Sequence, residues 1–338
     1  MAESRWQRAD GRFQRVLLIL GAVVLVAMIT SVSYGEYAIA PLDVIKTLLG
    51  IETANPGDAF AIRTLRLPRT LVAFLAGVGL AMAGTLTQGI TRNPLAAPSI
   101  IGVNAGASLA AVTVLVLLPN VPFSVLPFAA FGGALGVSLL IYLFAWQGGS
   151  SPLRLVLVGV GFSLIGGAFT SVIVTLGEIN LASQALVWLA GSVYGRTWEQ
   201  VIALFPWIAI CGVLALCWVR ELNVLHLGDD TARGLGSLVE GQRGFLLLLA
   251  VALAGASVAT AGTIGFVGLM APHLSRQLVG STYQAILPTA ALMGGAIVVL
   301  ADLIGRLLFA PIELPCGIIT AIIGAPYFLY LLIRDRER

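Results

Sequence analysis

Long apolar stretches, separated by short polar ones, dominate this chain. Eight stretches contain no Asp, Glu, Lys, Arg or His, and they cover residues 16–35, 70–91, 93–153, 155–177, 200–219, 244–272, 277–301 and 314–333. A helix needs about 20 mainly apolar residues to cross the hydrocarbon core of a bilayer. The pattern therefore predicts a protein with many membrane-spanning helices.

Ten spans follow when the stretches are divided at their breaks. They lie at about 16–33, 67–88, 97–118, 125–146, 153–176, 200–219, 244–261, 264–278, 283–308 and 315–333. Pro119 and Pro122 divide the longest stretch, because proline interrupts a helix. The eighth segment is short and contains Pro272, His273 and Arg276, which makes it the weakest span. The first run is too long for a secretory signal and lacks an A-x-A cleavage site. We predict an all-α integral membrane protein that forms one domain over 1–338.

Composition narrows the function classes. Charged residues make up 10% of the 338 residues, against about 25% in soluble domains. This excludes a soluble enzyme, a disordered chain and a nucleic-acid-binding protein. Lys46 is the one lysine, and no phosphate-binding GxxxxGK[ST] loop precedes it, so another subunit must hydrolyse any ATP that is used. The cysteines and histidines lack metal-ligand spacing, and we predict neither a catalytic residue nor a metal site.

The basic residues predict the orientation. With ten spans both termini lie on one side, and placing them inside puts thirteen of the nineteen Lys and Arg residues in cytoplasmic segments, as the positive-inside rule requires. The outer exceptions are Lys46, Arg63, Arg66, Arg69, Arg196 and Arg306. Three of them lie within seven residues just before a span. They are either interfacial arginines that snorkel to the headgroups or contacts for an acidic partner.

The predicted spans contain few ionisable side chains. Asp302 and Glu313 lie near span ends, and no carboxylate lies at mid-membrane. This argues against an ion-coupled transporter, although backbone carbonyls can hold Na⁺. GxxxG pairs, which allow close helix packing, occur at Gly102/Gly106, Gly132/Gly136 and Gly191/Gly195.

The longest cytoplasmic loop, 220–243, is too polar for lipid. Asp229 and Asp230 fit the first turn of a short helix after Gly228, where the helix dipole favours negative charge, and Gly234 and Gly236 end it. One apolar side is predicted from Leu225, Leu227, Ala232, Leu235 and Leu238. The loop is either a docking site for a partner or an ordinary amphipathic surface loop.

Several motifs resemble one family of membrane proteins. They include QGITRNPLAAPSIIG at 88–102, WLAGSVYGRTWEQV at 188–201, LHLGDDTARGLG at 225–236, GFVGLMAPHLSR at 265–276 and ELPCGIITAIIGAPYFLYLL at 313–332. The sequence resembles the FecCD-type permease subunits of ABC importers for iron-siderophores, haem and cobalamin.

The resemblance implies ten transmembrane helices per subunit in a type II importer permease. It implies a homo- or heterodimer with a path along its axis, flanked mainly by the fifth and tenth spans. A cytoplasmic ATPase dimer, which binds ATP and Mg²⁺, would dock on the 220–243 loop, and an extracytoplasmic binding protein would deliver the ligand. The location implied is the bacterial cytoplasmic (inner) membrane, in contact with its lipid.

The resemblance also assigns residues. Arg66, Arg69 and Arg306 match the outer arginines that pair with carboxylates of the binding protein, and Arg63 is a plausible extra contact. The ATPase-coupling positions are Leu227, Gly228, Asp229, Asp230, Ala232, Arg233, Leu235 and Gly236. The cytoplasmic gate falls in the turn QGGSSPLRL, with Ser150, Ser151 and Pro152 as candidates. Here Pro152 and Leu153 replace small hydroxyl residues, and Pro152 alternatively just begins the fifth span.

A ferric siderophore is the favoured substrate, because WLAGSVYGRTWEQV resembles the siderophore permeases more than the cobalamin permease. Haem and cobalamin stay open as alternatives. The competing classes are an ion-coupled secondary transporter and, more distantly, a membrane enzyme.

Overall fold

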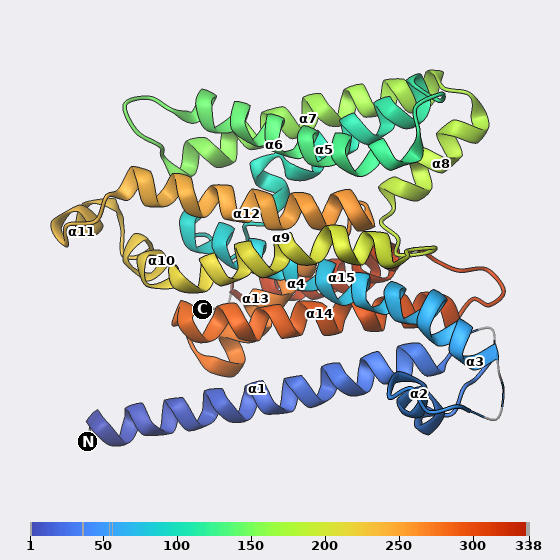
Figure 1. Ribbon diagram of the computed structural model, residues 1–338. Coiled ribbons are helices and arrows are strands. Elements are labelled where there is room, and N and C mark those ends of the chain that lie inside the picture. Colours follow the sequence, from blue (N-terminus) through green and yellow to red (C-terminus); the bar gives the residue numbers. More distant parts are fainter. Residues whose placement is uncertain (1, 36, 54, 56, 336–338) are drawn as a thin grey trace.

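The computed structural model describes residues 2–35, 37–53, 55 and 57–335, and its elements are helices apart from one isolated bridge (Figure 1). A helix lies at each of the ten predicted segments. These are α1 (Ala2–Ser33), α4 (Leu67–Thr91), α5 (Val103–Val112), α6 (Leu126–Ala145), α7 (Pro152–Leu176), α9 (Trp198–Cys217), α12 (Val239–Ala261), α13 (Val267–Val279), α14 (Tyr283–Leu307) and α15 (Cys316–Asp335). Within the described residues, seven helical segments are long and apolar enough to cross a membrane, while α5, α13 and α15 are shorter or more polar. The all-α, multi-span prediction is confirmed.

Short helices occupy the connections. They are α2 (Pro41–Leu48), α3 (Gly57–Phe60), η1 (Ala61–Arg66), η2 (Pro98–Ile101), η3 (Thr113–Leu117), η4 (Phe123–Val125), α8 (Ile179–Leu189), α10 (Val219–His226) and α11 (Asp229–Gly234). The break at Pro119 and Pro122 lies between η3 and η4, as predicted. The eighth span begins three residues later than predicted, because Gly262 and Phe266 have positive φ angles of 73° and 65°, outside the helical region.

Helix α4 forms the centre of the bundle and packs against α9, α12, α13 and α14. Two glycines make this possible. A Cβ atom at Gly77 would come within 2.2 Å of the Gly294 carbonyl oxygen, and one at Gly84 within 2.0 Å of the Gly268 carbonyl oxygen. Any side chain at either position would force α4 away from α14 or α13.

The predicted pair Gly132/Gly136 does not pack α6 against another helix of the described chain. A Cβ atom at Gly132 or Gly136 would meet no atom within 4 Å, whereas one at Gly133 would meet the Gly106 carbonyl oxygen at 2.3 Å. Successive residues of a helix point about 100° apart, so the glycine that packs α6 against α5 is the neighbour of the GxxxG pair.

The two ends of the bundle carry different short helices. In Figure 1, α10 and α11 lie at the left end, and α2, α3 and α8 lie at the right end. Helix α1 begins and α15 ends toward the left, on the side of α10 and α11. The predicted coupling loop and the predicted outer arginines are therefore at opposite ends of the molecule.

Candidate functional site

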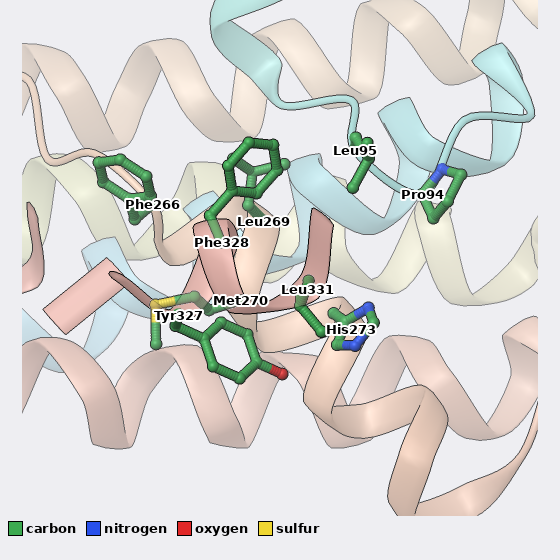
Figure 2. A pocket seen from close by; sticks show the side chains of 9 residues that line it. All are labelled: Pro94, Leu95, Phe266, Leu269, Met270, His273, Tyr327, Phe328 and Leu331. Atoms are coloured by element: carbon green, nitrogen blue, oxygen red, sulfur yellow. The ribbon is translucent and has the colours of Figure 1, made fainter. Parts of the chain in front are cut away.

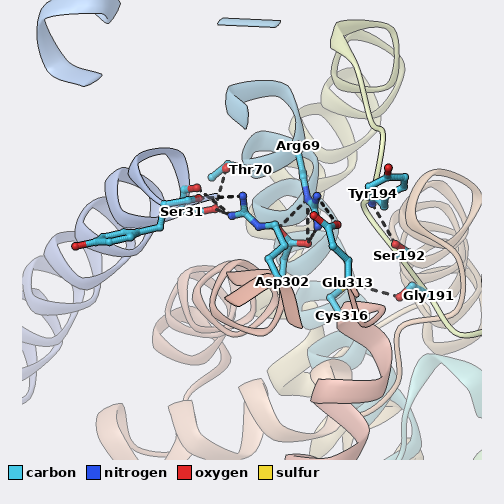
Figure 3. A network of polar contacts seen from close by, with 11 residues as sticks. Ser31, Arg69, Thr70, Gly191, Ser192, Tyr194, Asp302, Glu313 and Cys316 are labelled. Atoms are coloured by element: carbon cyan, nitrogen blue, oxygen red, sulfur yellow. Dashed lines mark hydrogen bonds and ion pairs between the residues drawn. The ribbon is translucent and has the colours of Figure 1, made fainter. Parts of the chain in front are cut away.

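A network of ion pairs joins α4, α14 and the segment before α15 at the right end of the bundle (Figure 3). Arg69 donates to both carboxylate oxygens of Asp302, with a shortest distance of 2.7 Å, and to Glu313 at 2.8 Å. The side chains of Arg69 and Asp302 are 11% and 3% exposed, whereas Glu313 is 32% exposed. Glu313 is therefore the solvent-facing partner in this network.

Arg306 extends the network to α1. Its guanidinium donates to the Ser31 carbonyl at 2.9 Å, to the Ser31 hydroxyl at 2.8 Å and to the Tyr34 carbonyl at 3.2 Å. It also lies 3.4 Å from Asp302. A cation near the end of α1 is favourable, because the last carbonyls of a helix lack partners and carry partial negative charge.

Arg66 makes a second set of contacts with the same region. It donates to the carbonyls of Val32, Ser33 and Tyr37 at 3.0, 2.9 and 2.7 Å, and its guanidinium lies over the Tyr37 ring. Arg63 is exposed and donates to the Thr47 carbonyl.

The structure thus brings three of the predicted docking arginines together but gives them an internal role. Arg66 and Arg306 are buried, because each satisfies carbonyls where α1 ends. Their guanidinium groups donate to groups of the chain itself. Arg69 is largely covered, and Arg63 is exposed. The docking role itself stays a prediction. Sequence reasoning had placed Asp302 and Glu313 at span ends without recognising them as partners of Arg69.

A second polar cluster lies at the opposite end, around Arg243 of α12. Arg243 is 1% exposed. It donates to Asp229 of α11 at 2.6 Å and to the Ser150 hydroxyl at 3.0 Å, and it also donates to the Ser150 carbonyl. One buried guanidinium therefore joins the predicted coupling helix to the predicted gate turn.

Further charges surround this cluster. Glu240 accepts from the Ser150 amide at 2.9 Å and hydroxyl at 2.5 Å. Arg92, just after α4, lies 3.3 Å from Asp229, and Arg233 lies 3.8 Å from Glu240. Sequence reasoning missed Arg92, Glu240 and Arg243. Glu240 and Arg243 lie at the end of the polar loop and Arg92 lies in another predicted cytoplasmic segment, and their positions in the sequence do not reveal which residues pair.

The predicted coupling residues form the short helix α11 and the residues that flank it, directly after α10. Asp229 and Asp230 occupy the first turn of α11, as predicted, and Gly228 and Gly236 have positive φ angles. Leu227, Leu235 and Leu238 are 62%, 65% and 79% exposed. Leu225 and Ala232 are instead buried, so the five apolar residues do not form one face. As a correction, the Ala232 side chain packs inside the loop and is not available to a partner.

The three predicted gate residues have different environments. Pro152 is the first residue of α7, as the alternative interpretation proposed, and Ser151 precedes it as an extended residue. Ser150 is 3% exposed and is held by Glu240 and Arg243. The turn is closed by the bridge between Trp146 and Ser150.

Three of the family-like motifs meet at one small cavity. The cavity is lined by residues of three segments (Figure 2). They are Pro94 and Leu95 of the first motif, Phe266, Leu269, Met270 and His273 at the start of α13 and within it, and Tyr327, Phe328 and Leu331 of α15. His273 lies 2.9 Å from Gln277 and packs edge-on to Tyr327, so it packs within the fold. Among the described residues, no three His, Cys, Asp or Glu side chains are placed to hold a metal ion.

Comparison with known proteins places this architecture among transporters. The family model for the FecCD transport family matches residues 23–334. The probable siderophore transport system permease protein YfhA of Bacillus subtilis is 47% identical over 331 residues, which cover 95% of each chain. The Fe(3+)-citrate import system permease protein YfmE of the same organism is 42% identical over 318 residues, which cover 94% of each chain. A solved structure described as an inward-facing conformation of a metal-chelate type ABC transporter superposes with a TM-score of 0.86 at 31% identity, covering 95% of this chain and 99% of that one.

Proposed function

This chain belongs to the FecCD transport family as an ABC transporter permease, and on that premise we propose that it imports a ferric siderophore across the bacterial cytoplasmic membrane. Its termini and the loop with α10 and α11 face the cytoplasm in this proposal, and Arg63 and Arg69 face outward. The thirteen basic residues of the predicted inner segments support this orientation.

The substrate proposal rests on the named relatives. Both are permeases of iron-chelate systems by name, one for a siderophore and one for ferric citrate. Haem and cobalamin are the alternatives, since they are also bulky chelates of a transition metal.

The energy comes from a partner in this proposal. A cytoplasmic ATPase dimer binds ATP and Mg²⁺ and docks on the exposed leucines around α10 and α11, and an extracytoplasmic binding protein supplies the substrate. A second permease subunit, identical or related, completes the path. The whole chain acts as one permease domain and carries no cofactor of its own.

One observation supports the mechanical part most directly. Arg243 holds Asp229 of α11 and Ser150 of the α6–α7 turn at the same time. A displacement of α11 would therefore be transmitted to the start of α7 through buried hydrogen bonds of Arg243. These bonds involve a charged group, so they are short and strong. In this way closing of the ATPase dimer would be coupled to the cytoplasmic end of the path as a rigid-body switch.

Reconstitution tests the proposal. The permease, its ATPase and its binding protein are placed in liposomes, and uptake of iron bound to a siderophore is measured with ATP supplied on the ATPase side. Parallel samples contain haem or cobalamin with the same proteins. We expect ATP-dependent uptake of the siderophore complex. If haem or cobalamin is taken up and the siderophore complex is not, the substrate assignment is wrong and the permease function still holds.

A further inference from the structure

A cavity of about 480 Å³ lies near the end of the bundle where α9 begins, between α6, α8, α9 and α12. Its wall is mostly aromatic and apolar: Phe123, Phe128 and Phe131 line it from the α6 side, and Trp188 and Trp207 from α8 and α9. Phe128 is 78% exposed and Trp207 is 44% exposed, so the cavity has an open aromatic rim. Trp207 lies halfway along α9, so in a bilayer this part of the rim would contact acyl chains.

The cavity also contains polar groups that the described part of the chain leaves without partners. The Trp188 side chain is 7% exposed, and its indole nitrogen has no hydrogen-bond partner there. The buried Nε atom of Arg196 likewise has none. A buried donor without an acceptor is costly, and each such group calls for a specific explanation.

Arg196 differs from the outer arginines described above. Those arginines contact carboxylates or backbone carbonyls of the chain, whereas no ion pair of Arg196 occurs among the described residues. Burial lowers the pKa of the Arg196 guanidinium, and only the nearby Cys316 opposes this shift. The second charge that lines the cavity is Glu199, which is exposed in the first turn of α9.

We propose that this cavity binds one phosphatidylethanolamine molecule from the outer leaflet, with its phosphate at Arg196, its ammonium at Glu199 and an acyl chain along the aromatic wall. Charge complementarity supports this occupant, because a zwitterionic headgroup matches one cation and one anion at the same mouth. The inference does not depend on the transport function proposed above.

Lipid binding by the purified full-length chain tests the inference without any transport measurement. The delipidated protein in detergent is titrated with phosphatidylethanolamine, phosphatidylglycerol or inorganic phosphate. Bound lipid is counted by native mass spectrometry, and tryptophan fluorescence follows the cavity wall. We expect the wild type to prefer phosphatidylethanolamine and to show no response to inorganic phosphate.

Variants then separate the contributions of Arg196 and Glu199 to lipid binding. Arg196→Gln should weaken phosphatidylethanolamine binding about tenfold, the change that corresponds to losing about 1.4 kcal/mol from a charge-assisted hydrogen bond. Glu199→Gln should shift the preference toward phosphatidylglycerol. Arg220→Gln, at an exposed arginine of α10 at the opposite end of the bundle (Figure 1), is the matched control and should leave lipid binding unchanged.

A second pair of variants keeps the test valid even if the Arg196→Gln variant does not fold. Ala203 is exposed and lines the cavity, so Ala203→Trp should fill it and displace the lipid. The neighbouring Ile202 is 70% exposed on α9 and is not part of the lining, so Ile202→Trp should have no effect. The inference is overturned if Arg196→Gln and Ala203→Trp retain wild-type lipid affinity, or if phosphatidylglycerol or phosphate binds as well as phosphatidylethanolamine.

Discussion

At the scale of single residues, buried arginines connect segments that are far apart in the sequence. Arg69 and Asp302 are separated by 233 positions, and Arg243 and Ser150 by 93. Removing one partner from a buried ion pair costs about 3–5 kcal/mol, because the remaining charge stays desolvated. Substitutions at these arginines therefore affect stability as well as function, and variants that distinguish the two effects are needed.

Arg243 is the first such residue. We expect Arg243→Gln to reduce ATP-driven uptake strongly and to lower thermal stability, since Asp229 and Ser150 lose their shared donor. Arg243→Lys keeps the charge but lacks the planar fork that reaches several acceptors, so it should recover stability more than uptake. Exposed Arg220 in the adjoining α10 gives the control, Arg220→Gln. Wild-type uptake by Arg243→Gln would disprove the coupling role.

Glu313 provides a second test, at the outer network. If Arg69 docks the binding protein, Glu313 competes for its guanidinium at 2.8 Å. Glu313→Gln should then speed docking, most clearly at low salt where screening is weak, and the gain should vanish in an Arg69→Gln background. Docking rates measured across a salt series provide the answer. A lowered melting temperature with unchanged docking would instead make the network purely structural. Asp302→Asn, which leaves Arg69 and Arg306 without their buried negative charge, is the destabilising comparison.

The sequence could predict some of these residues and not others. Asp229 and Asp230 were placed correctly at a helix start, because that preference is local and follows from the helix dipole. The inward direction of Arg66 and Arg306 was not predictable in this way. It depends on where α1 ends in space, and on carbonyls that no side-chain pattern reveals.

At the scale of elements, the spans were predictable and the connections were not. Ten apolar segments were found because the bilayer imposes a length and a composition on each span. Helix α8 was missed, since its eleven residues are too few for a span and its start depends on Glu178, whose carboxylate accepts from the amides of Asn180 and Leu181. Such a cap is a local feature that hydropathy does not register.

Helix α11 and its flanks give a prediction at this scale. Leu235 is 65% exposed, so Leu235→Glu should leave the permease folded and weaken its assembly with the ATPase. Ala232 is fully buried in the same loop, so Ala232→Glu should lower thermal stability even without the ATPase. Co-purification and melting curves of the two variants provide the comparison. Full assembly by Leu235→Glu would remove the exposed leucines from the docking site.

At the scale of the whole molecule, burial is distributed unevenly over the spans. In the most apolar 18-residue stretch of each segment, 89% of the residues are buried in the segment that contains α4 and 83% in α12, but only 17% in α7. A helix that is apolar all round is covered by lipid or by another protein. The resemblance implies that the fifth span, which is α7, lies beside the path at the dimer axis, where a second subunit would cover it.

The energy source is the prediction that belongs to the whole molecule. The chain has no GxxxxGK[ST] loop, so the purified permease should hydrolyse no ATP, and its complex with the ATPase should. Import into liposomes should require ATP and should persist when protonophores and sodium ionophores remove the ion gradients. An ion-coupled transporter would show the reverse, because its driving force is the gradient itself. Liposomes with an imposed proton or sodium gradient and no ATP therefore decide between the two classes. Uptake under those conditions would contradict the ABC mechanism, and uptake only with ATP would exclude ion coupling through backbone carbonyls, which the sequence alone left open.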